Sequence, residues 1–247
     1  MSAQFTLASS QYLVNAAPRV TGYPFTVGLW YRHEALTAVV QTIWCLADTA
    51  TTNNYFVVDL AAPETLRAGA AAGGTQNNAL LTSGAVVARK WLFVVARFIT
   101  STNRRISAYY SDTGLVEHGN TTTSRAPTGI DTMTIGALKT STVSLPLGGC
   151  VAEYWLANAD IQLDGLALTD ATLLQLAFRG PFSMPNIPPS LIEYRTFRTD
   201  PILADSIGDY APVAQTWTNT NGVTVSDHPP LPYEYVRPGQ AKQQLVV

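Results

Sequence analysis

The stretch PFTVGLWYR, residues Pro24–Arg32, alternates two kinds of side chain with a period of two. Phe25, Val27, Leu29 and Tyr31 occupy every second position. Because successive side chains of a strand point to opposite faces of its sheet, these four residues predict one buried face. The stretch therefore predicts a β-strand.

The same period recurs in short runs on both sides of this strand, separated by Thr-, Asn- and Gly-rich turns. These runs are QFTLASSQYLV (4–14), TIWCLAD (42–48), YFVVDLA (55–61), KWLFVVARFI (90–99), RRISAYYSD (104–112), LVEHGNTTT (115–123) and DTMTIGAL (131–138). Residues 66–84 are small and polar, and we expect a weak strand with loops there. The pattern predicts an all-β protein, a two-sheet antiparallel jelly-roll sandwich with one short helix and an extended C-terminal arm.

The helix is predicted within residues 168–180. Thr169 is a suitable N-cap, and Asp170 places a negative charge in the first turn. Apolar side chains follow at helical spacing, and a glycine and a proline end the run. These residues are Leu173, Leu174, Ala177, Gly180 and Pro181.

The character of the chain changes towards its end, so we divide it into a sandwich at residues 1–190 and an extension at 191–247. LIEYRTF and GVTVS offer one or two strands in the extension, which either complete the sandwich or form a separate subdomain. A proline-rich arm follows, because prolines cannot donate to the middle of a sheet. We expect a partner to hold this arm through Pro229, Pro230, Pro232, Tyr233, Tyr235 and Arg237, and we expect Trp217 to be exposed.

Composition narrows the function classes. Of the 247 residues 47% are hydrophobic and 13% charged, which indicates a packed globular protein. A net charge of −2 gives no electrostatic basis for binding nucleic acid or an anionic membrane. No run reaches the roughly 18 apolar residues of a membrane span, and the N-terminus has no secretory signal pattern. Cys45 and Cys150 are expected to be buried free thiols, with a single disulfide as the alternative.

In order, these segments resemble the laminin-G-like members of the concanavalin A-like lectin/glucanase superfamily. The resemblance covers roughly residues 3–181. It includes FTLASSQYLV, PFTVGLWYR, the Trp-led tract from residue 90, MTIGAL, and the GCVAEYWLAN strand followed by LTDATLLQLA. Ala152 departs from the family pattern, which commonly has Asp there, and ADIQLDGLA lengthens the segment before the helix. The resemblance implies a jelly-roll sandwich, and this fold carries many functions.

Glu153 is the residue that a glycosidase interpretation would use. The retaining glucanases of this superfamily carry carboxylates spaced E-x-D-x-x-E on one strand, and retaining chemistry needs two carboxyl groups about 5 Å apart. Here Trp155 and Asn158 stand in place of the second and third carboxylates. Strict alternation would place Glu153 on one face with Val151 and Trp155. We therefore expect a framework residue, held by a hydrogen bond or an arginine.

Other chemistry is also unsupported by the sequence. His33, His118 and His228 are far apart, and no nucleophile-elbow, zinc-protease or P-loop motif is present. We expect no cofactor. Many laminin-G-like domains hold calcium, for which loop aspartates would be the ligands here, although solvated loop acids are the favoured interpretation. Those aspartates are Asp48, Asp59, Asp112 and Asp131.

The sequence thus leads to two hypotheses. The first is a non-enzymatic structural virion protein, most concretely a bacteriophage capsid decoration protein that is made in the host cytoplasm, binds neighbouring capsid subunits and forms homo-oligomers. The virion role rests on the resemblance. The second is a carbohydrate-binding module that attaches an assembly to surface glycans.

Overall fold

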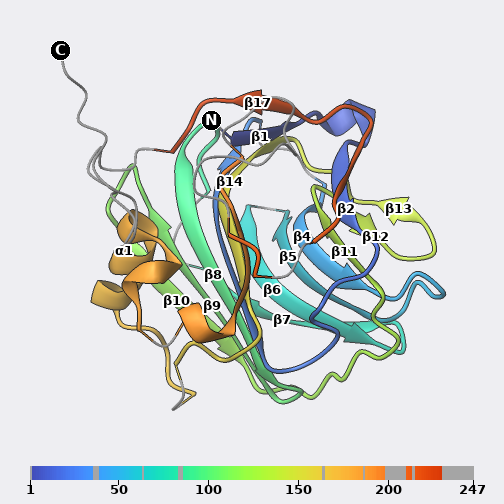
Figure 1. Ribbon diagram of the computed structural model, residues 1–247, viewed down its shortest axis with the longest axis horizontal. Coiled ribbons are helices and arrows are strands. Elements are labelled where there is room, and N and C mark those ends of the chain that lie inside the picture. The colour runs from blue at the N-terminus through green and yellow to red at the C-terminus, as the bar shows by residue number, and fades with distance from the viewer. Residues whose placement is uncertain are drawn as a thin grey trace.

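Two antiparallel sheets stack face to face, and helix α1 (Asp170–Arg179) lies outside them (Figure 1). This computed structural model describes residues 2–35, 39–62, 64–82, 86–162, 165–185, 187–197, 210–212 and 215–229. The arrangement is the jelly-roll sandwich that the period-two runs predict, so the predicted fold class is confirmed.

Each sheet has a defined strand order in the described part of the chain. The first runs β10 (Val116–Thr121), β9 (Asn103–Tyr110), β8 (Trp91–Thr100), β3 (Phe25–His33), β14 (Gly149–Ala157), β1 (Ser2–Phe5) and β17 (Thr224–Ser226), with β15 (Leu191–Arg195) also paired to β14. The second runs β16 (Thr218–Thr220), β2 (Tyr12–Asn15), β11 (Thr132–Ile135), β4 (Gln41–Ala47), β5 (Tyr55–Ala61), β6 (Thr65–Ala72) and β7 (Thr75–Leu80). A small hairpin joins β12 (Leu138–Lys139) to β13 (Val143–Ser144), and single 3-10 turns span η1 (Leu7–Ser9), η2 (Pro181–Ser183) and η3 (Pro188–Ser190).

The core between the sheets is built on aromatic rings. Phe25 of β3 stacks on Phe98 of β8 with ring centroids 4.5 Å apart, and it meets Phe56 of β5 edge-on at 5.1 Å. Such pairs add to the stabilisation that burial of the rings provides. The residues of β3 that alternate with Phe25 lie in the same core, whereas Trp30 faces the other side of the sheet. The alternation predicted for Pro24–Arg32 is therefore confirmed.

Residues 65–80 are more regular than predicted. Instead of a weak strand with loops, β6 and β7 form a complete hairpin that is paired with β5. Its two-residue turn is Gly73–Gly74, with φ of +60° and +80°. Positive φ at both positions is the geometry that a tight hairpin turn needs and that glycine adopts without strain. The small side chains weaken the sequence signal, but the backbone pairs that β5 offers decide the structure.

Strand β14 departs from the expected alternation. Ala152 pairs with Trp30 and Trp155 with Gly28, so two residues of β14, Glu153 and Tyr154, oppose a single residue of β3. This β-bulge reverses the faces along the rest of the strand. Val151, Tyr154 and Leu156 lie in the core between the sheets, while Ala152, Trp155 and Ala157 face the helix. The prediction that Val151 shares a face with Trp155 was wrong, because an inserted residue shifts the period.

Helix α1 covers the outer face of the first sheet, as Figure 1 shows. It begins as predicted, since the side chain of Thr169 accepts a hydrogen bond from the Thr172 amide at 3.2 Å. Its buried residues are Leu173, Leu176 and Ala177. Leu176 thus takes the buried position that the sequence assigned to Leu174. A ten-residue helix is marginal alone, so this packing is what stabilises it.

The described part of residues 191–247 lies within the sandwich. Strand β15 pairs with β14, β16 extends the second sheet through β2, and β17 extends the first sheet through β1. Between β16 and β17 the chain crosses from one sheet to the other, where the Gln11 side chain donates to the carbonyls of Asn221 and Gly222. Of the two alternatives for the extension, the described residues complete the sandwich.

Candidate functional site

Glu153 is held in an unusual backbone conformation by the bulge in β14. Its φ is +49°, in the left-handed region that residues with a Cβ atom rarely adopt. Such a conformation costs on the order of 1–3 kcal/mol and persists where the surrounding structure enforces it. The residue is only 6% exposed. The bulge therefore directs a carboxylate into a buried site on the helix-facing side of the sheet.

Two side chains from the extension hold this carboxylate. The Tyr194 hydroxyl on β15 donates to Oε2 of Glu153, and Nε2 of His228 lies 2.8 Å from Oε1. The other ring nitrogen of His228, Nδ1, lies 3.0 Å from the carbonyl oxygen of Pro229. Glu153 thus links the sandwich to the last described residues of the chain. The prediction of a framework residue held by a hydrogen bond matches these contacts, with tyrosine and histidine as the partners.

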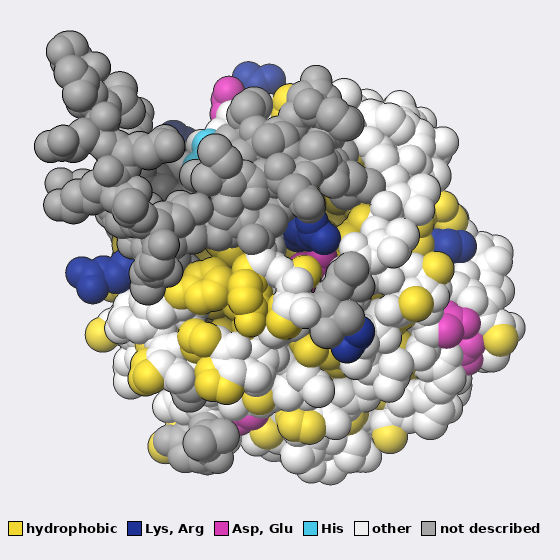
Figure 2. Space-filling view, in the orientation of Figure 1, with side chains coloured by type: hydrophobic (Ala, Val, Ile, Leu, Met, Phe, Trp, Pro, Cys, Tyr) yellow, Lys and Arg dark blue, Asp and Glu magenta, His cyan; other side chains and the backbone are white. Residues whose placement is uncertain are grey.

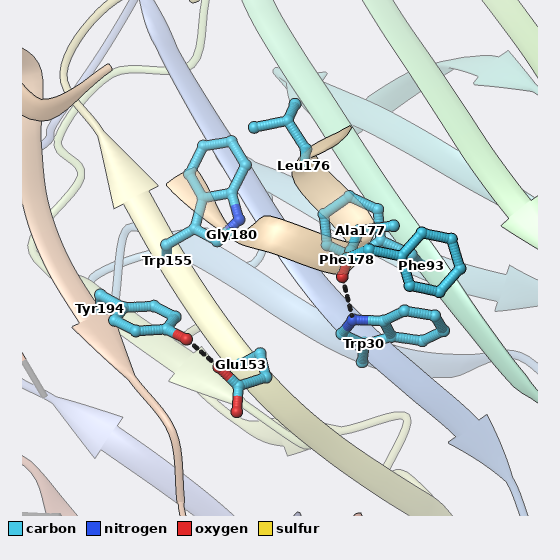
Figure 3. A pocket seen from close by; sticks show the side chains of 9 residues that line it. All are labelled: Trp30, Phe93, Glu153, Trp155, Leu176, Ala177, Phe178, Gly180 and Tyr194. Carbon is cyan, nitrogen blue, oxygen red and sulfur yellow. Dashed lines mark hydrogen bonds between the residues drawn. The ribbon is translucent and has the colours of Figure 1, made fainter. Parts of the chain in front are cut away.

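Next to Glu153 lies a hollow between the first sheet and α1 (Figure 3). Apart from the solvent at its mouth, the hollow has room for about one water molecule. Aromatic rings dominate its walls, and the Glu153 carboxylate is its charged group. The lining residues are Trp30, Phe93, Glu153, Trp155, Leu176, Ala177, Phe178, Gly180 and Tyr194.

The two tryptophans of the hollow differ in their hydrogen bonding. The Trp30 indole N–H donates to the Ala177 carbonyl of α1 at 3.1 Å. The Trp155 indole nitrogen is buried and has no hydrogen-bond partner among the described residues. In Figure 3 this nitrogen points towards the middle of the group of lining residues. Leaving a buried N–H group without an acceptor costs folding free energy.

Gly28 of β3 is what lets the Trp155 ring lie against the sheet. A Cβ atom at Gly28 would be 2.2 Å from Cε2 of Trp155 and 2.5 Å from its indole nitrogen. No side chain can replace the glycine without displacing the ring. Gly28 and Trp155 are paired across the two strands, immediately after the bulge.

A cluster of three hydrogen-bonded polar side chains connects β9, β10 and α1. The Ser107 hydroxyl lies 2.8 Å from Nδ1 of His118, and Nε2 of His118 lies 3.0 Å from the Asp170 carboxylate. Serine, histidine and aspartate are the residues of a catalytic triad, but here the serine is buried and the aspartate is exposed. Ser107 is 3% exposed, whereas the Asp170 side chain is 71% exposed. A nucleophile must meet its substrate, so this arrangement instead ties the first turn of α1 to the sheet.

The remaining carboxylates that the sequence singled out lie apart from Glu153. Asp59 makes a bidentate ion pair with Arg67, although burial still raises the pKa of this aspartate above its usual value. Asp48 and Asp131 accept hydrogen bonds from the turn at residues 49–51. Across the described ranges, no group of three His, Cys, Asp or Glu side chains could hold a metal ion. Asp48, Asp59 and Asp131 thus accept hydrogen bonds from protein groups.

Glu193 is the buried carboxylate nearest to Glu153 along the β14–β15 pair, but it lies on the opposite face. It precedes Tyr194, and successive side chains of a strand alternate sides. Its Oε1 accepts from the Trp217 indole at 2.7 Å and from Arg195 at 2.7 Å. Trp217 is therefore half-buried and not exposed as predicted, because its N–H satisfies this carboxylate and its ring packs edge-on against Tyr154.

The predicted arm lies mostly outside the described residues. Pro229 is buried and carries the carbonyl that His228 contacts. Pro230, Pro232, Tyr233, Tyr235 and Arg237 lie beyond the described residues. Both cysteines are buried free thiols, which excludes the disulfide alternative. Among the helices of the described chain, none is long and apolar enough to cross a membrane.

The residues that line the hollow could not be recognised as neighbours from the sequence. They come from β3, β8, β14, β15 and α1, and only the topology makes them neighbours. One signal was present, namely a glycine at Gly28 inside a strong strand pattern. Such a glycine often marks the close approach of another group, which here is the Trp155 ring.

No protein-family model and no curated protein matches the sequence. Solved structures share its fold. A heptameric SAP-like pentraxin from Limulus polyphemus aligns with a TM-score of 0.57 and 11% identity over 90% of this chain and 93% of that chain. Tailspike protein 2 of an Escherichia coli O157:H7 bacteriophage gives 0.56 and 13%, over 78% of this chain and 26% of that chain. The LG1-3 region of the laminin alpha2 chain gives 0.50 and 18%, over 63% and 30%.

At these identities the likeness establishes the fold. Pentraxin, laminin-G and tailspike domains share the concanavalin A-like jelly roll, which is the fold that the sequence resemblance implies. The chain corresponds to about a quarter of the tailspike and to less than a third of the laminin region. Fold and site together define a concanavalin A-like jelly-roll domain with a buried carboxylate beside an aromatic hollow.

Proposed function

We propose that this protein is a non-enzymatic structural component of an assembly, most concretely a virion protein that decorates a capsid by binding neighbouring subunits. The observation that carries the proposal is the path of the C-terminal segment. Strands β16 and β17 are built into both sheets, and His228 is fixed on Glu153. The chain after Pro229 thus starts from a rigid anchor. Its proline-rich sequence favours an extended conformation that loses little entropy on binding a neighbour.

The surface supports the same proposal. On the face in Figure 2, the charged side chains of the described residues are scattered among larger uncharged polar and apolar areas. Core regions of protein interfaces are depleted in charged residues in the same way. A bacteriophage tailspike contains a similar fold, so the fold is compatible with a role in a virion.

The test compares the full chain with a chain that ends at Pro229, using light scattering. Ending there retains the contacts of His228 and of β17, so the sandwich stays intact. We expect the full chain to form a homo-oligomer and the shortened chain to be a folded monomer. Equal masses for the two chains would contradict the role of the arm.

A carbohydrate-binding module for surface glycans is the second candidate function. The fold is compatible with it, because jelly-roll sandwiches include lectin domains, although the rings beside Glu153 are buried and offer no open face to a sugar. A glycan array probed with and without calcium tests this candidate. Binding in either condition would support it, and an absence of binding in both would count against it.

A further inference from the structure

Helix α1 carries apolar side chains outside the side that packs against the first sheet. Leu174 and Phe178 are half-buried, although the sequence placed Leu174 in the buried face of the helix. Residues four apart lie on the same side of a helix, so these two side chains form one apolar ridge. The core of the sandwich does not account for this ridge.

The ridge continues onto β9 and β10, which lie beside α1 (Figure 1). The Phe178 ring meets the Tyr109 ring of β9 edge-on, with ring centroids 5.3 Å apart. Tyr109 is paired across the strands with Val116 of β10, and both side chains are half-buried on the helix side of the sheet. Asp170, one turn before Leu174, is hydrogen-bonded to β10, so Leu174 faces the same strand. Leu174, Phe178, Tyr109 and Val116 are called the apolar patch below.

We propose that the apolar patch binds the C-terminal arm, residues 230–247, of a neighbouring copy of this protein. The inference rests on the proposed assembly role and names the surface that receives the arm. Proline-rich segments dock on aromatic surfaces because the extended conformation that prolines favour loses little entropy on binding. In an extended arm Tyr233 and Tyr235 point to the same side, where their rings pack against Tyr109 and Phe178.

The size of the apolar patch favours an extended segment as its occupant. Four half-buried side chains present far less area than the roughly 800 Å² that each partner buries in an interface of standard size. A patch of this size is insufficient for docking the face of a folded subunit. It suits a segment that is anchored by a few aromatic rings, which contribute most of the binding energy in small interfaces.

The origin and length of the arm favour the patch of a neighbour. The arm starts after Pro229, beside Glu153 of β14, and residues 230–247 span up to about 56 Å at about 3.1 Å per residue. Helix α1 packs on β3 and β8, which lie between β14 and β10 in the sheet. The direct path from the start of the arm to the patch of its own chain is therefore occupied by the helix. A neighbouring copy presents its patch without this obstruction.

The test mixes two chains that each lack one half of the contact. Full-length Leu174→Lys keeps the arm but places a charge in the apolar patch, and the chain that ends at Pro229 keeps the patch but lacks the arm. Lysine at position 174 should weaken binding of the arm by about tenfold or more, so each chain alone should be a monomer in light scattering. The mixture should contain a 1:1 complex of the two chains.

The outcomes separate this inference from the assembly role itself. A native oligomer that is lost when the chain ends at Pro229, but is kept in Leu174→Lys, would overturn the patch and leave the role of the arm standing. Two monomeric chains that form no complex on mixing would also overturn it, because the arm would then bind its own chain or another surface. A native chain that is already a monomer would contradict both proposals.

Two further variants complete the design. Val143→Lys is the matched control, because Val143 is an exposed apolar residue of the separate β12–β13 hairpin, and it should keep the mass of the native oligomer. Lysine is a good helix former, so Leu174→Lys should retain α1, which circular dichroism checks. If Leu174→Lys does not fold, full-length Val116→Thr takes its place, because it keeps a β-branched side chain in β10 and should also weaken the oligomer. An oligomer as stable in Val116→Thr as in the native chain would then overturn the inference.

Discussion

At the scale of single residues, Glu153 determines the geometry of the site. One additional residue in β14 turns its carboxylate towards Tyr194 and His228 and reverses the faces of the residues that follow. Trp155 thereby comes to lie over Gly28 and towards the helix. The strain at φ +49° is maintained because both oxygens of the carboxylate are hydrogen-bonded.

Replacing Glu153 with alanine should lower the free energy of unfolding by about 1–3 kcal/mol, because the Tyr194 hydroxyl and the His228 ring lose an acceptor in a buried site. Urea denaturation measures the change. Glu153→Gln keeps one acceptor oxygen and should lose less. An alanine variant as stable as the native chain would show that the network contributes nothing to the fold.

Gly28→Ala should destabilise the protein by about 1–3 kcal/mol, since the new Cβ would overlap the Trp155 ring. Gly22→Ala is the control, because a Cβ there meets no atom within 4 Å. Thermal unfolding gives the stabilities, and tryptophan fluorescence reports the displaced ring. Equal melting temperatures for the two variants would mean that the ring moves aside without cost.

His33 should make stability depend on pH. It is fully buried, its Nδ1 lies 2.6 Å from the Tyr31 hydroxyl, and burial lowers the pKa of the imidazole. In the unfolded chain the group titrates near pH 6.5. As the pH falls through about 6.5, the unfolded state therefore binds a proton that the folded state resists, and stability decreases.

His33→Gln should flatten this part of the stability curve. Urea denaturation of both chains at about pH 7.5 and pH 5.5 measures the difference. The native chain should lose more stability than the variant between the two pH values. An equal loss would show that His33 does not cause the dependence.

The limits of sequence reasoning are visible at this scale. The alternation in Pro24–Arg32 correctly placed the four apolar residues from Phe25 to Tyr31 in the core and Trp30 on the other face, because the local side-chain pattern determines a regular strand. The same reasoning failed at Val151 and Trp155. Nothing in glutamate favours a positive φ, so the bulge is imposed by the neighbouring strands and could not be predicted.

At the scale of elements, α1 shows how a short helix depends on its cap and on the sheet. Thr169 caps it, and Leu173, Leu176 and Ala177 pack on the first sheet. The Trp30 indole bonds to the Ala177 carbonyl, and His118 bonds to Asp170 in the first turn, so side chains of the sheet hold the helix near both of its ends. One wall of the hollow therefore depends on the helix staying in place.

Thr169→Ala should lower the free energy of unfolding by about 1 kcal/mol, the usual effect of removing an N-cap hydroxyl. Thr169→Ser retains the acceptor and should be close to the native chain. Chemical denaturation followed by circular dichroism compares the three chains. If serine were as destabilising as alanine, the hydroxyl would not be the stabilising group.

The elements differ in how well the sequence predicts them. The cap and end of α1 follow from local chemistry, so they were predicted to the residue. Strands β6 and β7 carry small side chains with little intrinsic preference, and their pairing with β5 decides their structure. Strands β16 and β17 are three residues each and are stabilised by β2 and β1, from the opposite end of the chain.

At the scale of the whole molecule, the chain closes its sandwich with its C-terminal segment. The last described residues contact both sheets and the Glu153 site, so the arm that follows has a fixed origin.

The central claim is that the arm joins copies of this protein, and competition by the arm itself tests it most directly. The mass of the full chain is measured by light scattering with and without an excess of a peptide of residues 230–247, alongside a peptide of the same composition in scrambled order. The account predicts an oligomer that the native peptide, and not the scrambled one, converts to monomer. A mass that the native peptide leaves unchanged, whether oligomeric or monomeric, would contradict it.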